Sequence, residues 1–322
     1  MSQSIDPATL QADKLQILWN PKAGPQERNA AALEQIQAEH GEQVQVYVTE
    51  SEEHSATLAT QLVEQGARLI AAAGGDGVIN VVTDAILRTG RNDVTLVVLP
   101  SGTGNDYARS LGLPLSPVEV LPASLESNPT LLDVFELKGK PAFWRFGVNM
   151  LAGGNTGQYT KQLTDDMKQQ WGAFCFLRGA IGVLQNLEVF PVEVQFDDEP
   201  PQQFNALNIF VANGRCAGAG LSVAPNAALN DGLLDAVVVL DGTAVQLADL
   251  ALTYVVGDPR EHELILARPV RRFSIRAEKP MAWAVDGQEF SASELTVTIH
   301  PARLPVILGP TNPAVTLPPA IS

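Results

Sequence analysis

Cysteines, histidines in metal-ligand spacing and long apolar runs are scarce in this sequence. Two cysteines, Cys175 and Cys216, lie far apart, so we expect no disulfide framework and a reducing compartment. The four histidines show neither zinc-ligand spacing nor a Ser-His-Asp grouping. No stretch approaches the roughly 18 consecutive apolar residues that span a bilayer, and the first 13 residues contain no apolar signal-peptide core. These absences predict a soluble, cytoplasmic protein.

Positive charge is scarce as well. There are 21 Lys and Arg residues against 36 Asp and Glu, and the formal net charge is −15. Nucleic-acid binders need clustered Lys and Arg to displace counterions, and Arg271-Arg272 is the largest basic cluster, so a nucleic-acid partner is excluded. The same charge opposes electrostatic attachment to anionic lipid. Any membrane contact is therefore expected to be transient and hydrophobic, while 45% hydrophobic residues provide a full globular core.

The first third of the chain alternates short apolar runs with segments of helical period, which is typical of βαβ units. The pattern predicts an α/β, doubly wound parallel sheet that helices cover on both faces. Strands are expected at residues 15–19, 44–48, 68–73 and 94–100, and helices at residues 27–41, 51–66 and 78–90.

After about Pro122 the composition changes to β-rich runs bounded by Pro, Gly, Asn and Asp, which predicts an antiparallel sandwich. The expected strands are residues 130–137, 142–150, 192–196, 205–212, 232–240, 272–277, 281–285 and 294–300. Two helices are expected, at residues 159–187 and 244–256. The predicted domains are residues 14–122, to which residues 303–309 could return, and residues 123–302, followed by a Pro-rich tail at residues 309–322.

Glycine-rich loops follow two of the predicted strands. The first reads Gly74-Gly75-Asp76-Gly77. Consecutive glycines let the backbone turn tightly and approach a ligand, and the N–H groups of the next helix attract an anion such as phosphate. Ligands of doubly wound sheets bind at the carboxyl ends of the strands, where this loop lies. A simple strand-to-helix turn is the alternative reading.

The second loop runs from Pro100 to Arg109 and holds Gly102, Thr103 and Gly104 before Asn105 and Asp106. Asp106 offers a carboxylate to a hydrated Mg²⁺, which prefers one or two carboxylates together with phosphates. Asn105 and Asp106 could instead form a helix cap. A third and weaker loop, Asn20 to Gly24, offers Lys22 as a counter-charge for phosphate, although such a lysine is more often a solvated surface residue.

Taken in order along the chain, these motifs resemble the diacylglycerol/sphingosine/ceramide kinase superfamily, and in particular its soluble bacterial lipid kinases. The resemblance extends over most of the chain and also includes Val148-Asn149, residues 211–214, residues 218–225, residues 231–235 and Val285-Asp286-Gly287. It implies a nucleotide-binding domain related to NAD kinases and phosphofructokinases, followed by a C-terminal β-sandwich. It also implies ATP with Mg²⁺ as phosphate donor and a lipid hydroxyl as acceptor.

The resemblance also implies roles for single residues. The nucleotide contacts of the family fall on Asn20, Pro21, Lys22, Ala23, Gly24, Thr49, Gly74, Gly75, Asp76, Gly77, Val78, Ile79, Asn80, Gly102, Thr103 and Asn105. Its carboxylates for metal binding and catalysis fall on Asp76, Asp106 and Asp133. A structural Mg²⁺ site would use the Asp231 side chain with carbonyl groups near Ala228 and Leu233.

Two positions depart from the family pattern. Val78 stands where a threonine is usual, which removes a hydroxyl from the phosphate loop. Gln288 stands where bacterial relatives have a catalytic Glu, and an amide cannot accept the proton of the acceptor alcohol. Three interpretations are open: Glu289 takes over, Asp76 acts as base, or the enzyme is slow or inactive. Strand alternation puts Gln288 and Glu289 on opposite faces, so Asp76 is favoured.

The preferred function is therefore an ATP- and Mg²⁺-dependent kinase that converts diacylglycerol to phosphatidic acid. A sphingoid base or another glycerolipid is the alternative acceptor, an NAD-kinase-like enzyme is a second alternative, and a catalytically degenerate nucleotide or lipid sensor is a third. The apolar segment at residues 171–187 could line an acyl-chain groove, dock on a bilayer, or simply pack between the domains. A homodimer is compatible with the sequence.

Overall fold

Four parallel strands form the sheet of the N-terminal lobe, in the order β4-β3-β1-β2. The computed structural model describes residues 14–155, 187–256 and 259–310. The strands are β1 (Leu15–Trp19), β2 (Val44–Val48), β3 (Leu69–Gly74) and β4 (Thr95–Pro100). All four strands predicted from the sequence are confirmed to within one residue.

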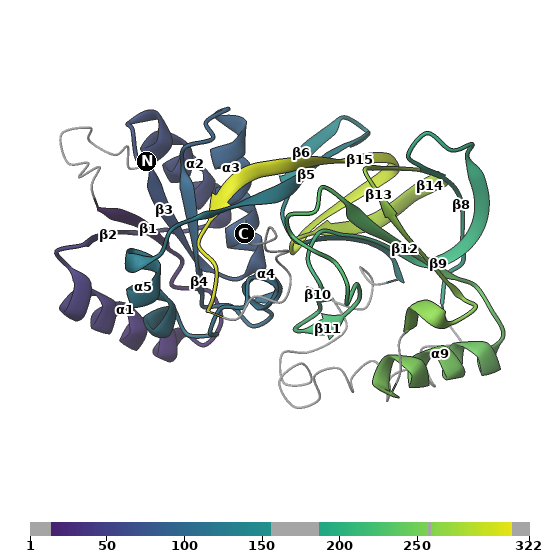
Figure 1. Cartoon of the computed structure of the whole chain (residues 1–322), viewed down its shortest axis with the longest axis horizontal. Helices are drawn as coiled ribbons and strands as arrows, with labels where there is room; N and C mark the ends of the chain where they lie inside the picture. Colours follow the sequence, from purple (N-terminus) through teal and green to yellow (C-terminus); the bar gives the residue numbers. More distant parts are fainter. Residues whose placement is uncertain (1–13, 156–186, 257–258, 311–322) are drawn as a thin grey trace, which may run out of the picture.

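Helices cover both faces of this sheet. They are α1 (Gln26–His40), α2 (Glu52–Glu64), α3 (Asp76–Arg88), α4 (Asp106–Ser110) and α5 (Pro117–Glu126). Figure 1 shows α2 and α3 on one face and α1 and α5 on the other. The sequence analysis missed α5 because Pro117 and Pro122 read as breakers, yet Pro117 occupies the first helical turn, where a missing N–H costs nothing.

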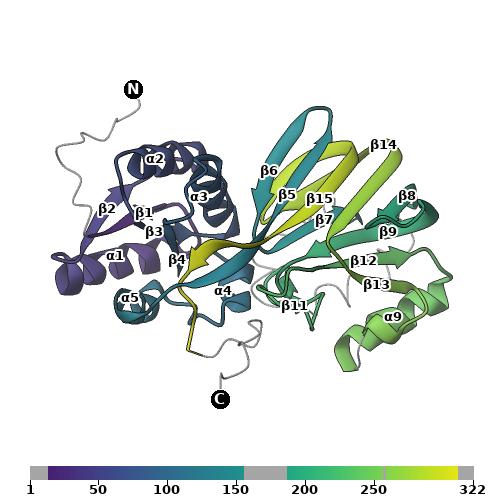
Figure 2. The same ribbon diagram turned by 45° about the horizontal axis from the view of Figure 1, so that its top comes forward.

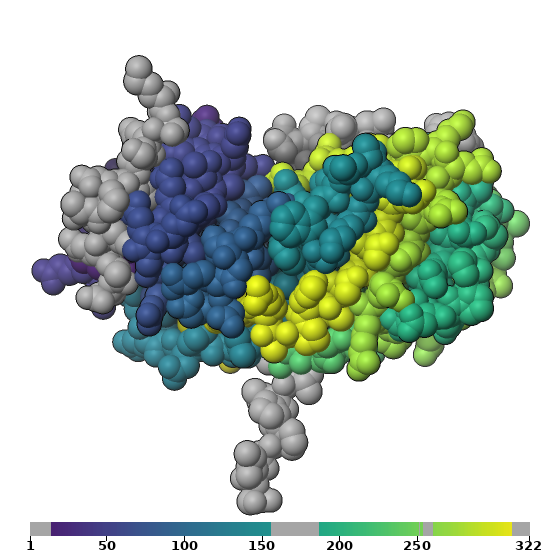
Figure 3. Space-filling view, turned by 90° about the horizontal axis from the view of Figure 1, so that it is seen from above, coloured from purple at the N-terminus to yellow at the C-terminus, as the bar shows by residue number. Residues whose placement is uncertain are grey.

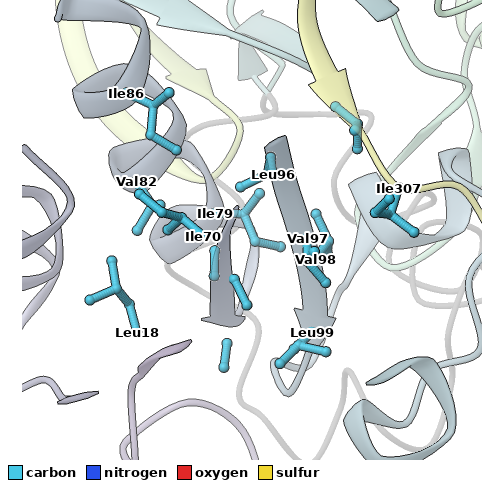
Figure 4. Close-up of a cluster of buried hydrophobic side chains, with 14 of the residues drawn as sticks. Leu18, Ile70, Ile79, Val82, Ile86, Leu96, Val97, Val98, Leu99 and Ile307 are labelled. Carbon is cyan, nitrogen blue, oxygen red and sulfur yellow. The ribbon is translucent and has the colours of Figure 1, made fainter. Parts of the chain in front are cut away.

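Helix α3 carries a mainly apolar and wholly buried stretch into the core of this lobe. Its residues 78–87 are all buried, and Ile79, Val82 and Ile86 face the strand residues Ile70 and Leu96 in Figure 4. Burying each of these side chains stabilises the fold by about 1.5–3 kcal/mol. The packing fixes the start of α3, and with it the Gly74 to Gly77 loop, against the carboxyl end of β3.

The C-terminal lobe consists mainly of antiparallel strands. They are β5 (Thr130–Lys140), β6 (Phe143–Gly147), β7 (Met150–Gly154), β8 (Phe190–Phe196), β9 (Gln202–Ala212), β10 (Cys216–Ala217), β11 (Leu221–Ser222), β12 (Leu234–Leu240), β13 (Ile265–Val270), β14 (Arg272–Val285) and β15 (Gln288–Val306). Helix α9 (Ala244–Val256), which the sequence predicts, is confirmed. A short 3-10 helix, η2, spans Pro259–Glu261. The predicted helix at residues 159–187 lies outside the described residues, apart from its last one.

Three of the predicted strands differ from the observed ones. The run at residues 142–150 divides into β6, which pairs with β5, and β7, which pairs with β9 and β14. The chain must change partners there, and the buried Asn149 lies at the break. The runs at residues 272–277 and 281–285 instead join into β14, which continues through a register shift between Arg276 and Met281.

Strand β15 connects the two lobes. It pairs with β14 and β5 in the C-terminal lobe, and its last residue, Val306, pairs in parallel with Leu96 of β4. The Ile307 N–H then donates to the Leu96 carbonyl at 3.1 Å, and Figure 2 shows this return of the chain. In the space-filling view of Figure 3 the β5–β6 hairpin lies between α3 and β15. One 13-stranded sheet therefore runs through both lobes.

Candidate active site

Three glycine loops meet at the carboxyl end of the parallel sheet. Gly24, with φ +55, packs so closely on the Ser101 carbonyl that a Cβ would collide with it. A Cβ on Gly102 would collide with the Gly75 Cα and would lie 3.1 Å from the Gly75 nitrogen. The loops after β1, β3 and β4 thus touch through their backbones, and this contact explains why glycine is required at two of these positions.

Polar side chains hold these loops in shape. Asn105, in the left-handed region at φ 53, accepts from the Gly102 N–H at 3.0 Å and donates to the Gly102 carbonyl at 2.9 Å. Asn29 of α1 donates to the Ser101 carbonyl at 3.1 Å, and the Asn20 N–H donates to the Ala73 carbonyl at 3.0 Å. Thr103 is exposed at the tip of its loop, where a ligand can reach its hydroxyl.

Asp76 is the first residue of α3 and points into the angle between two of the loops. Its Oδ1 accepts from the Tyr107 N–H at 3.0 Å. Burial raises the pKa of the Asp76 carboxyl, against this backbone donor, which favours the charged form. A methyl group on Gly104 would lie 3.1 Å from Asp76 Oδ2 and 3.5 Å from Asp106 Oδ2. The two carboxylates therefore face the same point.

The C-terminal lobe contacts Asp106 directly. Its Oδ1 accepts from the Gly220 N–H at 2.7 Å and its Oδ2 from the Ala219 N–H at 3.2 Å, both in the turn between β10 and β11. Burial, followed by the neighbouring charge of Asp76, raises the pKa of Asp106 to about 6. Because these two carboxylates repel each other, a cation between them would relieve an electrostatic cost.

The donor set at this point suits Mg²⁺. Two carboxylates beside a phosphate-type loop are the ligands that Mg²⁺ takes when it also binds substrate phosphates. Within the part of the chain that the structure describes, no group of three or more His, Cys, Asp or Glu side chains forms a metal cage. The pair would therefore need oxygens from a nucleotide to complete a coordination shell.

Asp133 lies beside the loop that contains Asp231. Its two carboxylate oxygens accept from the N–H groups of Gly232 and Ala302, each at 2.7 Å. Burial, and then the charge of Asp231, raises the pKa of Asp133. Asp231 Oδ1 accepts from the Leu233 N–H at 3.0 Å. The expected structural Mg²⁺ site with Ala228 stays a prediction, as does a metal role for Asp133.

Several residues expected at the nucleotide have side chains that face the interior, and their contacts with a nucleotide stay a prediction. Val78 is 3% exposed, and a Cβ on Gly74 would lie 2.6 Å from its Cβ, so Val78 packs beneath the loop. Ile79 is buried too, and its N–H donates to the Gly75 carbonyl within α3. Buried Thr49 donates its hydroxyl to the Trp19 carbonyl at 3.2 Å. These side chains shape the loops rather than line them.

Asn80 and Lys22 are likewise engaged by protein atoms. Asn80 donates to Asp286 Oδ2 and to the Phe146 carbonyl, each at 3.1 Å, and so ties α3 to the C-terminal lobe. The Lys22 ammonium donates to the Glu50 carbonyl at 2.9 Å on the surface. Pro21 and Ala23 complete the turn, in which the Ala23 N–H donates to the Asn20 carbonyl at 3.3 Å.

Gln288, rather than Glu289, lies at the Gly74 to Gly77 loop. Gln288 pairs with Val285 and Glu289 with Ala284 in a two-residue turn, so the register does not shift to bring Glu289 inward. The Gln288 Nε2 donates to Glu52 Oε2 at 2.6 Å and lies 3.4 Å from the Gly77 carbonyl oxygen. Strand alternation directs Glu289 to the opposite face.

Asp286 is a residue whose role the sequence analysis did not identify. It is buried at φ 46 and accepts hydrogen bonds from the N–H groups of Val148, Asn149 and Met150, at 2.8, 3.1 and 2.7 Å, in addition to Asn80. Burial raises its pKa to about 6, although all four donors favour the charged form. In the sequence, Asp286 precedes a glycine between two predicted strands. That pattern is equally typical of an ordinary turn, so it does not indicate the buried role of Asp286.

Ser110 and Asn149 form a second polar bridge between the lobes. Ser110 of α4 donates to Asn149 Oδ1 at 2.9 Å, and Asn149 Nδ2 donates to the Cys216 carbonyl at 2.9 Å. The free thiol of Cys216 is half-buried, whereas Cys175 lies outside the described residues. No described helix is long and apolar enough to cross a membrane.

Comparison with known proteins identifies relatives along the whole chain. Residues 14–137 match the family described as the diacylglycerol kinase catalytic domain, and residues 153–308 match the YegS C-terminal NAD kinase beta sandwich-like domain. A Pseudomonas aeruginosa protein named probable lipid kinase YegS-like is 30% identical over 308 residues, covering 95% of this chain and 97% of the relative. Probable lipid kinase YegS of Escherichia fergusonii is 27% identical, covering 92% and 96%.

A solved structure shares the fold. The crystal structure of a putative diacylglycerol kinase from Bacillus anthracis superimposes with a TM-score of 0.77 at 22% identity and covers 95% of this chain and 99% of that chain. The predicted fold class, an α/β N-terminal doubly wound nucleotide-binding domain followed by a C-terminal β-sandwich domain, is confirmed.

Proposed function

Because the chain belongs to the YegS-like lipid kinases of the diacylglycerol kinase-like superfamily, we propose that it transfers the γ-phosphate of ATP to a lipid hydroxyl with the help of Mg²⁺. Kinases of this kind use a nucleoside triphosphate, so a phosphate site is the first requirement. We propose diacylglycerol as the acceptor and phosphatidic acid as the product. A sphingoid base or another glycerolipid is the alternative acceptor.

The observation that carries this proposal is the meeting of three glycine loops beside two facing carboxylates. Gly24, Gly75 and Gly102 leave the backbone bare where the sheet ends. The first N–H groups of α3 open toward this point, and the helix dipole there favours an anion. A triphosphate placed here would lie next to Asp76 and Asp106.

The roles of the residues follow from their positions. Backbone N–H groups of the loops would bind the phosphates, and the exposed Thr103 would add a hydroxyl. Asp76, which the sequence favours as the base, would instead hold Mg²⁺ together with Asp106, because the two carboxylates face the same point. The cation would neutralise the charge that develops on the transferred phosphoryl group. Phosphoryl transfer proceeds through a loose transition state, so orientation and charge stabilisation supply most of the rate.

The direct test measures transfer of radiolabel from the γ-position of ATP to a panel of diacylglycerol, a sphingoid base and other glycerolipids. We expect labelled phosphatidic acid, and separation of the products identifies the acceptor. Nucleotide that binds without labelling any lipid would instead favour the sensor, and formation of NADP⁺ from NAD⁺ would favour an NAD-kinase-like enzyme. Asp76→Ala should abolish transfer while its thermal unfolding curve stays cooperative.

A further inference from the structure

A carboxylate of the N-terminal lobe stands at the phosphate loop, opposite Gln288. Glu52 is the first residue of α2, and its Oε2 accepts from Gln288 Nε2 at 2.6 Å. A methyl group on Gly77 would lie 2.5 Å from Glu52 Oε1 and 2.8 Å from Gln288 Nε2. The two side chains therefore meet directly over the last glycine of the loop.

A cavity of about 480 Å³ opens beside this pair. Glu52 and Gln288 line it together with Ala56 of α2, Arg88 of α3 and Arg145 of β6. A polar headgroup could thus enter between cationic and apolar walls. An alcohol bound in this cavity would meet the Glu52 carboxylate next to the loop that we propose holds the donor phosphate.

We propose that Glu52 is the proton acceptor of the phosphotransfer reaction, an inference that rests on the proposed function. The proton of the lipid O–H passes to a Glu52 carboxylate oxygen while the alcohol oxygen forms its bond to the γ-phosphorus. The bond between the γ-phosphorus and the bridging oxygen breaks, and its electron pair leaves with ADP. A general base typically contributes about 10²–10⁴-fold to a rate.

The amide of Gln288 is a positioning group in this arrangement. Its N–H group donates to Glu52 Oε2 and so orients the carboxylate across the loop. The N-terminal end of α2 is capped where the Ser51 hydroxyl accepts from the His54 N–H at 3.1 Å, which fixes the first turn that carries Glu52. In this protein the carboxylate at the loop is therefore supplied by Glu52 of α2, whereas position 288 of β15 supplies an amide.

Charged neighbours face the same cavity from three elements. Arg145 of β6 and Arg88 of α3 supply positive charge, while Asp84 of α3 and Glu53 of α2 supply negative charge. Arg88 is already paired with Asp84 at 2.7 Å, and Arg145 donates to Asn80 Oδ1 at 3.1 Å. Glu52 therefore shares the cavity with side chains of both charge signs, and the two arginines already have protein partners.

The experiment exchanges the two side chains. We expect Glu52→Gln to lower kcat for lipid phosphorylation about a hundredfold, with ATP affinity, measured by calorimetry, unchanged. The double variant Glu52→Gln/Gln288→Glu should have a kcat at least tenfold higher than that of Glu52→Gln, because residue 288 of β15 then supplies the carboxylate. Gln288→Glu alone should gain no rate, because two carboxylates this close share a proton. Glu64→Gln, an exposed residue at the other end of α2, is the matched control.

The outcomes separate this inference from the proposed function. A Glu52→Gln rate equal to that of the Glu64→Gln control would overturn the role of Glu52 alone, since lipid transfer by the wild type would still stand. A double variant no faster than Glu52→Gln, or a Gln288→Glu variant faster than the wild type, would also overturn it. A wild-type protein that phosphorylates no lipid would overturn both claims together.

Discussion

At the scale of single residues, two aspartates share one electrostatic situation. Asp76 and Asp106 lie side by side, both partly buried, and the charge of Asp76 raises the pKa of Asp106. The main partners of both carboxylates are backbone N–H groups and not basic side chains. Tyr107 donates to Asp76, and Ala219 and Gly220 donate to Asp106. The two carboxylates can therefore bind a cation, whose place a basic side chain would otherwise take.

This pair predicts how Mg²⁺ affinity depends on pH. The pKa of Asp106 is raised to about 6, so its carboxyl keeps a proton below that pH and is charged above it. A cation needs the charged form. We expect the Mg²⁺ concentration required for half-maximal ATP-dependent phosphorylation to rise about tenfold per pH unit below pH 6, and to be flat above pH 7. Titrations of Mg²⁺ between pH 5 and 8 measure this.

The Asp106→Asn variant should need more Mg²⁺ at every pH and should lose the dependence around pH 6. Asp198→Asn, a change at an exposed residue of the C-terminal lobe, provides the control with the same change of charge and should follow the wild-type profile. An unaltered profile in Asp106→Asn would contradict the assignment of the titration to this residue.

At the scale of elements, the turn between β14 and β15 does more than reverse the chain. It presents Asp286 to three successive backbone N–H groups of residues 148–150 and to Asn80 of α3. The next residues, Gly287 and Gln288, then lie against Gly77. One turn of the C-terminal lobe thus positions the Gly74 to Gly77 loop of the N-terminal lobe.

Replacing Asp286 tests this role. In Asp286→Asn one acceptor oxygen becomes an N–H₂ group that faces existing donors, and buried donors that lose their partner cost about 1–3 kcal/mol. We expect the free energy of unfolding to fall by that amount, and ATP affinity to fall with it because α3 loses its anchor. Urea denaturation and calorimetry give the two values. Asp241→Asn, in an exposed loop, should change neither.

The elements that sequence reasoning predicted are those with a strong local pattern. The four parallel strands are mainly apolar runs that are followed by glycine-rich or polar loops, so the sequence shows both where each strand lies and where it ends. The division at Asn149 and the fusion into β14 depend on which strand lies alongside, which a single segment does not encode. Helix α5 was hidden by prolines that its first turn tolerates.

The candidate site was predictable in part for the same reason. Gly75, Asp76 and Asp106 follow strands of one parallel sheet, so their meeting follows from the topology. Glu52 carries no motif of its own, and its place beside Gln288 depends on a contact between residues 236 positions apart. Val78 and Asn80 are interior because α3 is buried on all sides over residues 78–87. Val78 packs in the core of the N-terminal lobe, and Asn80 bonds to Asp286 of the other lobe, which the local sequence does not encode.

At the scale of the whole molecule, the lobes meet through hydrogen bonds that a ligand would compete for. Asp106 accepts from Ala219 and Gly220, so a cation on its carboxylate would weaken this interlobe contact. We expect Mg²⁺ with ATP to speed amide hydrogen exchange at residues 216–222 severalfold, relative to the nucleotide-free protein. Mass spectrometry measures this, with the buried strand β3 as internal reference.

Protection that increased at residues 216–222 would show that the cation leaves this contact intact and would contradict the expected competition. Asp106→Asn provides an independent comparison, because it weakens the same contact without any ligand. Its exchange at residues 216–222 should already be fast and should respond little to Mg²⁺ and ATP.

The length of β15 limits how this protein can move. If the lobes moved apart, either the pairing of β15 with β5 or the pairing of Val306 with Leu96 would have to break, because β15 belongs to both lobes. Twisting about the axis of that strand breaks none of its ladder. Binding at the candidate site should therefore be accompanied by twisting between the lobes about β15, and not by their separation.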